Sequence, residues 1–189
     1  MNTLDWRHIE NGDKDAYSQA YIFYYKKLYN YGRKFTENEA LIEDTIQELL
    51  MDLWNRKEKL SSIAFPHTYL LSAFRFNLFK KIKQDARMLA YTGAEPEPEF
   101  GAEHLIIKNE SDAATRERLQ QALQTLTPRQ REAIFLRFYE ELSYEEVAGV
   151  LDISVKATYK IVARALLELK DNLSLPMVTL LLLLRSARF

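Results

Sequence analysis

The chain has 189 residues, a formal net charge of −1 and no cysteine. This length fits one large domain or two small ones, and the low content of Gly and Pro favours a globular, helix-rich protein. The absence of cysteine excludes disulfides and thiolate metal sites. The near-zero charge argues against a protein that grips DNA unaided, because such proteins usually carry a clear positive excess. No apolar stretch follows a basic start at the N-terminus, so we expect no signal peptide.

The first strong helix signal is a capping box at residues 36–39, with Thr36 as the expected N-cap. The helix that follows carries one apolar stripe at helical spacing, formed by Ile42, Ile46, Leu49, Leu50 and Leu53. Its opposite face carries Asp44, Gln47 and Glu48. Like charges four residues apart weaken an isolated helix. Two interpretations therefore remain open: an ordinary solvated face, or a face whose charge a partner compensates.

A second helix is expected to begin near Pro66, and it mixes aromatic with basic residues. Between residues 69 and 91 there are five basic residues and one acidic residue. Basic side chains suit phosphates, and aromatic faces can stack on unpaired bases. We expect Phe74 and Phe79 to belong to the core and the basic cluster to meet nucleic acid.

The composition changes at residues 93–111, where Pro alternates with Glu. From residue 93 to residue 118 there are seven acidic and three basic residues. Pro removes helical hydrogen bonds and the carboxylates repel one another. We interpret this stretch as an acidic flexible linker between two helical domains; the alternative is a long surface loop within one domain.

The second half of the chain predicts a helix–turn–helix. Capping boxes begin at Thr127 and at Ser143, and Ser154 caps a last helix that runs to about residue 169. Asp152 stands in the turn, where Gly is usual, and Asp tolerates a left-handed backbone. Lys156 and Lys160 are placed for base edges or phosphates in the major groove. A plain helical hairpin is the alternative.

Residues 175–184 are almost unbroken apolar residues, a run too short to span a bilayer. We favour packing of this tail against a domain. Insertion into a partner and contact with a membrane surface are the alternatives.

Together these segments resemble the extracytoplasmic-function group of the sigma-70 superfamily. The resemblance rests on residues 43–50, which match an Asp-x-x-Gln-Glu segment, on residues 69–77, and on residues 126–132 with 142–148. It implies an all-α fold of two small helical domains joined by an acidic linker, the second containing a helix–turn–helix. The implied layout is a sigma-2 domain at 1–91, a linker at 92–114, a sigma-4 domain at 115–173 and an apolar tail at 174–189.

The resemblance also implies three binding sites. The polymerase-binding site is Asp44, Gln47 and Glu48. The site for the −10 promoter element is Arg75, Asn77, Lys80, Lys81, Lys83 and Arg87. The site for the −35 element is Ser154, Lys156, Ala157, Tyr159, Lys160 and Arg164. The chain departs from the family at Lys80, where an Asp is frequent, and at residues 157–159, where Thr-Val-Lys is frequent.

The implied function is that of a cytoplasmic sigma factor without catalytic residues, cofactor, metal or small-molecule substrate. Its expected partners are the β′ clamp helices and β-flap of core RNA polymerase, promoter DNA, and an anti-sigma factor that can hold it at the membrane. A helix–turn–helix regulator that is not a polymerase subunit is the second hypothesis, and a helical signalling adaptor is the third. An enzyme is least favoured, because His8, His67 and His104 are scattered and no Gly-rich phosphate loop exists.

Overall fold

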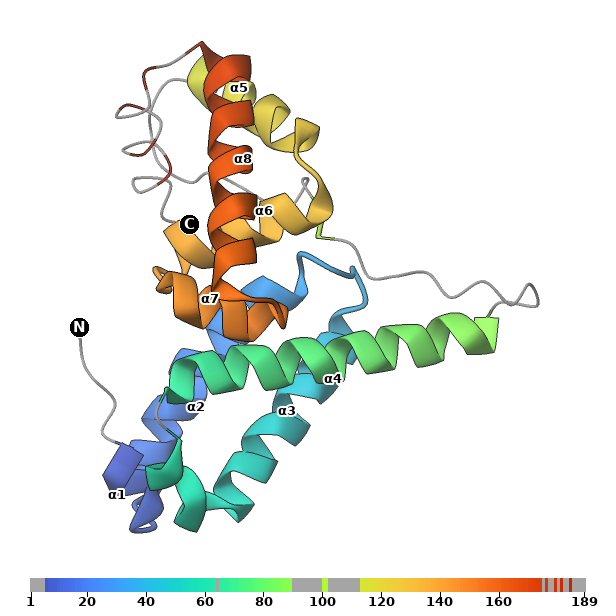
Figure 1. Cartoon of the computed structure of the whole chain (residues 1–189). Helices are drawn as coiled ribbons and strands as arrows, with labels where there is room; N and C mark the ends of the chain where they lie inside the picture. The colour runs from blue at the N-terminus through green and yellow to red at the C-terminus, as the bar shows by residue number, and fades with distance from the viewer. Residues whose placement is uncertain are drawn as a thin grey trace. The chain divides into compact units, whose positions relative to one another are not determined.

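The computed structural model describes residues 6–63, 65–89, 100–101 and 113–174, together with residues 176, 179, 181 and 184 of the tail. Every secondary-structure element in these ranges is helical, which confirms the all-α prediction. The chain divides into two compact units, Met1–Pro98 (unit 1) and Glu99–Phe189 (unit 2). Figure 1 shows the helices of each unit.

Unit 1 is a small helical bundle in which one central helix packs against two others. Its elements are α1 (Trp6–Glu10), α2 (Lys14–Gly32), α3 (Glu39–Asn55), the 3₁₀ helix η1 (Lys57–Ser62) and α4 (Pro66–Leu89). Helix α3 packs against α2 and against α4. The predicted apolar stripe of α3 is buried along its whole length. Burial of this stripe leaves the opposite face of α3 for the polar side chains.

Helix α3 begins two residues later than the sequence predicts, so the expected capping box is wrong. The N-cap is Asn38, whose side chain accepts a hydrogen bond from the Leu41 N–H at 3.2 Å. Thr36 Oγ1 instead accepts from the Asn38 N–H at 3.1 Å. The Glu39 carboxylate binds Arg33 Nη1 at 2.9 Å instead, and the Thr36 N–H donates to the Gly32 carbonyl at 3.3 Å.

The end of α2 packs closely against both α3 and α4. A Cβ atom built on Gly32 would lie 2.8 Å from Ile42 Cγ2 on α3 and 3.0 Å from Phe74 Cζ on α4. Real side chains are not found this close together. Glycine at this position therefore lets three helices approach one another.

Unit 2 is built around one long helix. Its elements are α5 (Ala113–Thr125), α6 (Pro128–Ile134), a π-helical segment η2 (Phe135–Tyr139), α7 (Tyr144–Leu151) and α8 (Val155–Leu173). Helices α5, α6 and α7 all pack against α8. Both capping boxes predicted for this half are formed, by Thr127 with Gln130 and by Ser143 with Glu146.

The turn between α7 and α8 has the geometry of a helix–turn–helix. Asp152 ends α7 in the left-handed conformation, with φ 52° and ψ 55°, as its tolerance for this region predicts. The Ile153 N–H donates to the Ala148 carbonyl at 3.0 Å, which closes the end of the helix. Ser154 then caps α8 by accepting from the Ala157 N–H at 3.2 Å.

The predicted linker and tail lie mostly outside the described residues. Within the linker, Phe100 is buried, and its ring centroid lies 5.5 Å from that of Phe135 in η2. Within the tail, Leu184 is buried and Leu181 is exposed. Across the described segments, no helix is both long and apolar enough to cross a membrane.

We expect Gly32→Ala to lower the free energy of unfolding of unit 1 by about 1–3 kcal/mol, since extra atoms would be forced into a filled core. Both tryptophans of the chain, Trp6 and Trp54, lie in unit 1, so tryptophan fluorescence during urea unfolding measures the loss. Ile42 supplies the closest atom, so the same substitution should cost less in an Ile42→Ala background. Equal losses in both backgrounds would contradict this packing argument.

We expect Ser154→Ala to destabilise the first turn of α8 by about 1 kcal/mol, because the cap of the Ala157 N–H is lost. Amide hydrogen exchange along α8 measures the change as faster exchange. Ser154→Asp keeps an acceptor oxygen and is the matched control, with exchange close to that of the wild type. Unchanged protection in the alanine variant would show that the cap does not hold the helix start.

Candidate protein and nucleic-acid interfaces

The exposed side of α3 carries the three residues that the sequence assigns to polymerase binding. Asp44, Gln47 and Glu48 are all exposed and share one side of the helix. Met51 lies one turn further along the same side, with 62% of its surface exposed. We call Asp44, Gln47, Glu48 and Met51 the α3 face. A single exposed apolar side chain is common on protein surfaces, so both interpretations of this face stay open.

Tyrosines of α2 line the flank of α3 and bind its neighbouring groups. The hydroxyl of Tyr25 donates to Glu43 Oε1 at 3.0 Å, and the hydroxyl of Tyr17 donates to the Leu50 carbonyl at 2.9 Å. Partial burial and then the Glu43 carboxylate raise the pKa of Tyr25. Glu43 is therefore occupied within unit 1, whereas Asp44 points to solvent.

An ion pair connects the α3 face to α4. Lys81 Nζ lies 2.9 Å from Glu48 Oε2, and the lysine side chain is mostly buried while the glutamate is mostly exposed. The sequence places Glu48 at the polymerase site and Lys81 at the DNA site. The structure brings these two residues together, so part of the charge of each is satisfied by the other.

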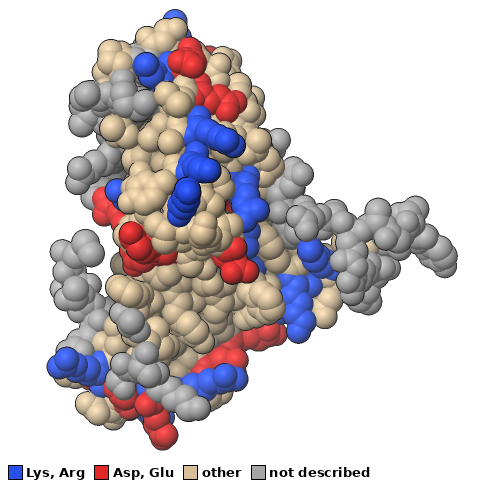
Figure 2. Space-filling view, viewed as in Figure 1, with Lys and Arg blue, Asp and Glu red and all other residues tan. Residues whose placement is uncertain are grey.

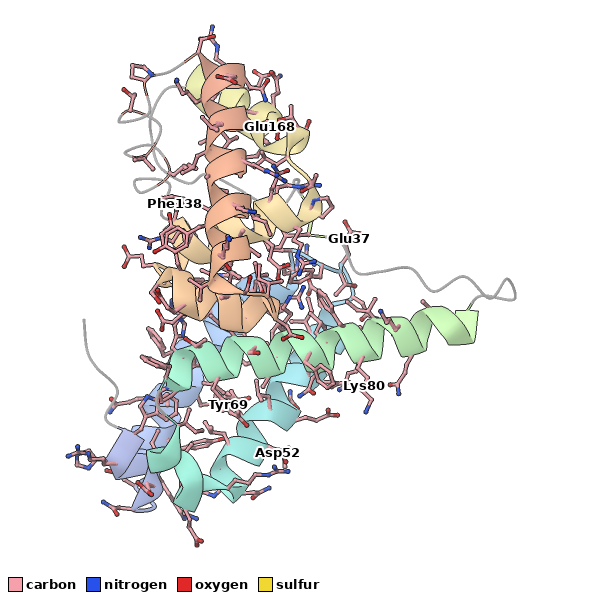
Figure 3. The ribbon with its side chains drawn as sticks, viewed as in Figure 1. Glu37, Asp52, Tyr69, Lys80, Phe138 and Glu168 are labelled. Atoms are coloured by element: carbon pink, nitrogen blue, oxygen red, sulfur yellow. The ribbon has the colours of Figure 1, made fainter. Side chains whose placement is uncertain are left out.

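One side of α4 combines exposed aromatic rings with lysines. Helical spacing puts Tyr69, Phe76, Lys80 and Lys83 on a common side. We call these residues the α4 face; Tyr69 and Lys80 are labelled in Figure 3. Phe76 is 70% exposed, and Lys80 is exposed. Phe74, by contrast, is fully buried, as predicted for a core residue.

Three other −10 candidates, Arg75, Asn77 and Lys81, lie off the α4 face. The Arg75 guanidinium lies 4.3 Å from the centroid of the Phe79 ring, a cation–π contact within the helix. Asn77 is half-buried, and Lys81 turns towards α3. The side chain of Arg87 lies outside the described residues. The five −10 candidates whose side chains the structure describes thus divide between the α4 face and its flanks.

The −35 candidates form a stripe along α8. Lys156, Tyr159, Lys160 and Arg164 are exposed, and we call them the α8 stripe. The other side of the helix is buried through Thr158, Val162, Ala165 and Leu169. Ser154 is committed to the helix cap, and Ala157 is half-buried. Figure 2 shows a column of basic side chains over α8 and another basic group over α4.

Met51 of the α3 face and Tyr144, which contacts the α8 stripe, are not among the residues that the sequence predicts for these sites. Met51 lies three residues after Glu48 and seven after Asp44, which is the spacing of one helix side. Tyr144 stacks on Tyr159, with ring centroids 3.9 Å apart and an interplanar angle of 18°. The position of Met51 could have been found from periodicity. The Tyr144–Tyr159 stack depends on how α7 crosses α8.

Among the residues that the structure describes, the largest pKa shifts lie away from the three surfaces. Burial and then Arg33 lower the pKa of Lys34 to about 8, and burial and then Glu140 raise the pKa of Tyr139 to about 12. Neither residue belongs to the three surfaces. In the part of the chain that the structure describes, no cluster of acidic and histidine side chains could hold a metal ion. The surfaces are suited to binding through charge, shape and stacking.

Comparison with known proteins gives one family. Residues 116–169 match the family model described as Sigma-70, region 4. The ferric citrate uptake sigma factor FecI of Escherichia coli (strain K12) is 30% identical over 135 residues, which are 67% of this chain and 70% of FecI. The ECF RNA polymerase sigma factor SigK of Mycobacterium ulcerans (strain Agy99) is 24% identical over 149 residues, 75% of this chain and 77% of SigK.

Among solved structures, the fold is similar to that of the sigma factor RpoE from Bartonella quintana, crystallised with the anti-sigma factor NepR. The TM-score is 0.56 at 21% identity, covering 84% of this chain and 96% of RpoE. The similarity to FecI extends over two thirds of both proteins, and the region 4 match spans the helix–turn–helix of unit 2. This chain belongs to the extracytoplasmic-function (ECF) RNA polymerase sigma factors of the sigma-70 family, and is therefore a non-enzymatic subunit of transcription initiation.

Proposed function

We propose that this sigma factor divides promoter recognition among three surfaces. The α3 face docks on the β′ clamp helices of core polymerase, the α4 face takes the opened −10 element, and the α8 stripe enters the major groove at the −35 element. The observation that carries the proposal is the separation of charge: exposed acids with Met51 on α3, and exposed bases on α8, each opposite a buried apolar stripe.

The assignment of domains follows from the same division. Unit 1 corresponds to a sigma-2 domain at residues 1–91, and unit 2 contains a sigma-4 domain at residues 115–173 that also binds the β-flap. The acidic linker is assigned to residues 92–114 and the apolar tail to residues 174–189. Two findings support this layout. The boundary between the compact units falls between Pro98 and Glu99, inside the predicted linker, and the region 4 match lies within unit 2.

The chemistry of the α4 face suits a melted strand better than a duplex. Exposed rings of Tyr69 and Phe76 offer stacking surfaces for unpaired bases, and Lys80 and Lys83 lie on the same side for the phosphates. Base–aromatic stacking contributes about 1–3 kcal/mol per base. The Glu48–Lys81 ion pair joins α4 to α3, the helix that carries the proposed docking face.

Regulation by an anti-sigma factor is part of the proposal. The structurally similar RpoE is crystallised with the anti-sigma factor NepR. A protein with the exposed α3 face and α8 stripe offers two polymerase- or DNA-facing surfaces that an inhibitor could cover. We place the protein in the cytoplasm, where core polymerase and promoter DNA are found, and an anti-sigma factor can hold it at the membrane.

Runoff transcription tests the function directly. Purified core polymerase supplied with this protein should produce transcripts from genomic fragments that core polymerase alone does not produce. The protein alone should bind the same fragments weakly, because its net charge of −1 gives little nonspecific affinity. Tight occupancy of the promoter without core polymerase, and no new transcript with it, would favour the separate helix–turn–helix regulator.

Substitutions on single surfaces should separate core binding from promoter binding. Asp44→Ala, Gln47→Ala and Met51→Ala should each weaken binding to core polymerase, and the largest loss should exceed about 1 kcal/mol, as for a central interface residue. Lys156→Ala and Lys160→Ala should leave core binding intact and lower the use of −35-dependent promoters. Fluorescence anisotropy with core polymerase and runoff transcription measure the two effects.

The matched control is Glu58→Ala, which removes an exposed acid of η1 outside the α3 face. It should change neither measurement. Glu48 is left unchanged, because its removal would also free Lys81. Wild-type core binding by all three α3 variants would rule out the assigned docking face.

A further inference from the structure

The α8 stripe has an aromatic flank as well as a basic one. Tyr159 is 50% exposed and lies one turn from Lys156. Its ring is nearly parallel to that of Tyr144, the first residue of α7, at a centroid distance of 3.9 Å. Half of the Tyr159 surface thus stays exposed on the side of α8 that carries the basic side chains.

The position of Tyr144 is fixed by its own neighbours. It follows Ser143, whose side chain accepts from the Glu146 N–H at 3.1 Å in the capping box. The Arg137 guanidinium lies 5.0 Å from the Tyr144 ring centroid, and its Nη1 donates to the Leu142 carbonyl at 2.9 Å. Arg137 is thereby anchored to the loop before α7. Stacking on a ring held in this way restricts the rotation of Tyr159 before any DNA is bound.

On a helix in the major groove, the half-exposed ring of Tyr159 would meet the base edges, and only one group on those edges is apolar. The four base pairs present hydrogen-bond donors and acceptors there, and only thymine adds a methyl group. We propose that Tyr159 reads a thymine methyl in the −35 element and that Tyr144, supported by Arg137, is its positioning residue. This inference rests on the proposed function of the α8 stripe.

The test uses holoenzyme and the strongest promoter fragment obtained by runoff transcription. Each thymine of its −35 element is replaced singly by uracil, which removes only the methyl group. For the wild type, one replacement should weaken holoenzyme binding by about fourfold, the factor expected for one buried methyl-sized group. Tyr159→Ala should bind the thymine and uracil fragments equally well. Tyr159→Phe should keep the discrimination, because it keeps the ring.

Two further variants distinguish recognition of the thymine methyl from a purely structural role of the Tyr144–Tyr159 stack. Tyr144→Leu removes the stacking partner without touching a base, so it should reduce the thymine preference while the protein stays folded by circular dichroism. Leu167→Ala changes an exposed side chain two turns beyond Lys160 and should keep the full preference. A stack that only joined α7 to α8 would alter thermal unfolding in Tyr159→Ala, and the thymine-to-uracil ratio would stay as in the wild type.

The inference is overturned if no thymine of the −35 element responds to uracil in the wild type, a result that needs no variant to fold. It is also overturned if Tyr159→Ala keeps the same preference. Failure of the proposed function looks different, because holoenzyme would then produce no transcript from any fragment and would show no promoter-specific binding.

Discussion

Helix α3 packs between two other helices, and this packing decides what unit 1 can present to a partner. Its apolar stripe is buried against α2 and α4, and the glycine at the end of α2 lets all three helices come close. Tyr17 and Tyr25 bind the flank of α3 through its backbone and through Glu43. With one side filled and one flank bonded, Asp44, Gln47, Glu48 and Met51 must face solvent. In the proposed function, this exposed face docks on core polymerase.

The same constraint acts on α8 in unit 2, with a different outcome because the exposed residues are basic. Burial of Val162, Ala165 and Leu169 turns Lys156, Lys160 and Arg164 outward. The helix start is defined by the left-handed Asp152 and the Ser154 cap, so the first turn of α8 is held firmly. The backbone of such a turn needs no further ordering on binding, which lowers the entropy cost of recognition.

Charge of both signs on separate faces accounts for the near-zero total. The α3 face is acidic, while the α4 face and the α8 stripe are basic, and the Glu48–Lys81 pair joins the α3 face to the flank of α4. A protein of this kind gains little from nonspecific attraction to DNA. In the proposed function, core polymerase supplies that attraction, and the sigma factor contributes position and selectivity.

The sequence alone determined the helical fold, the caps at Thr127, Ser143 and Ser154, and the buried and exposed sides of α3, because these depend on spacing within a few residues. It placed the start of α3 at the wrong residue, since the Arg33–Glu39 ion pair and the Asn38 cap compete with the expected box. Only the tertiary structure decided that Lys81 pairs with Glu48 and that Tyr144 supports Tyr159. Both contacts join residues from different helices, and their distances depend on how those helices cross, which the periodicity of one helix does not contain.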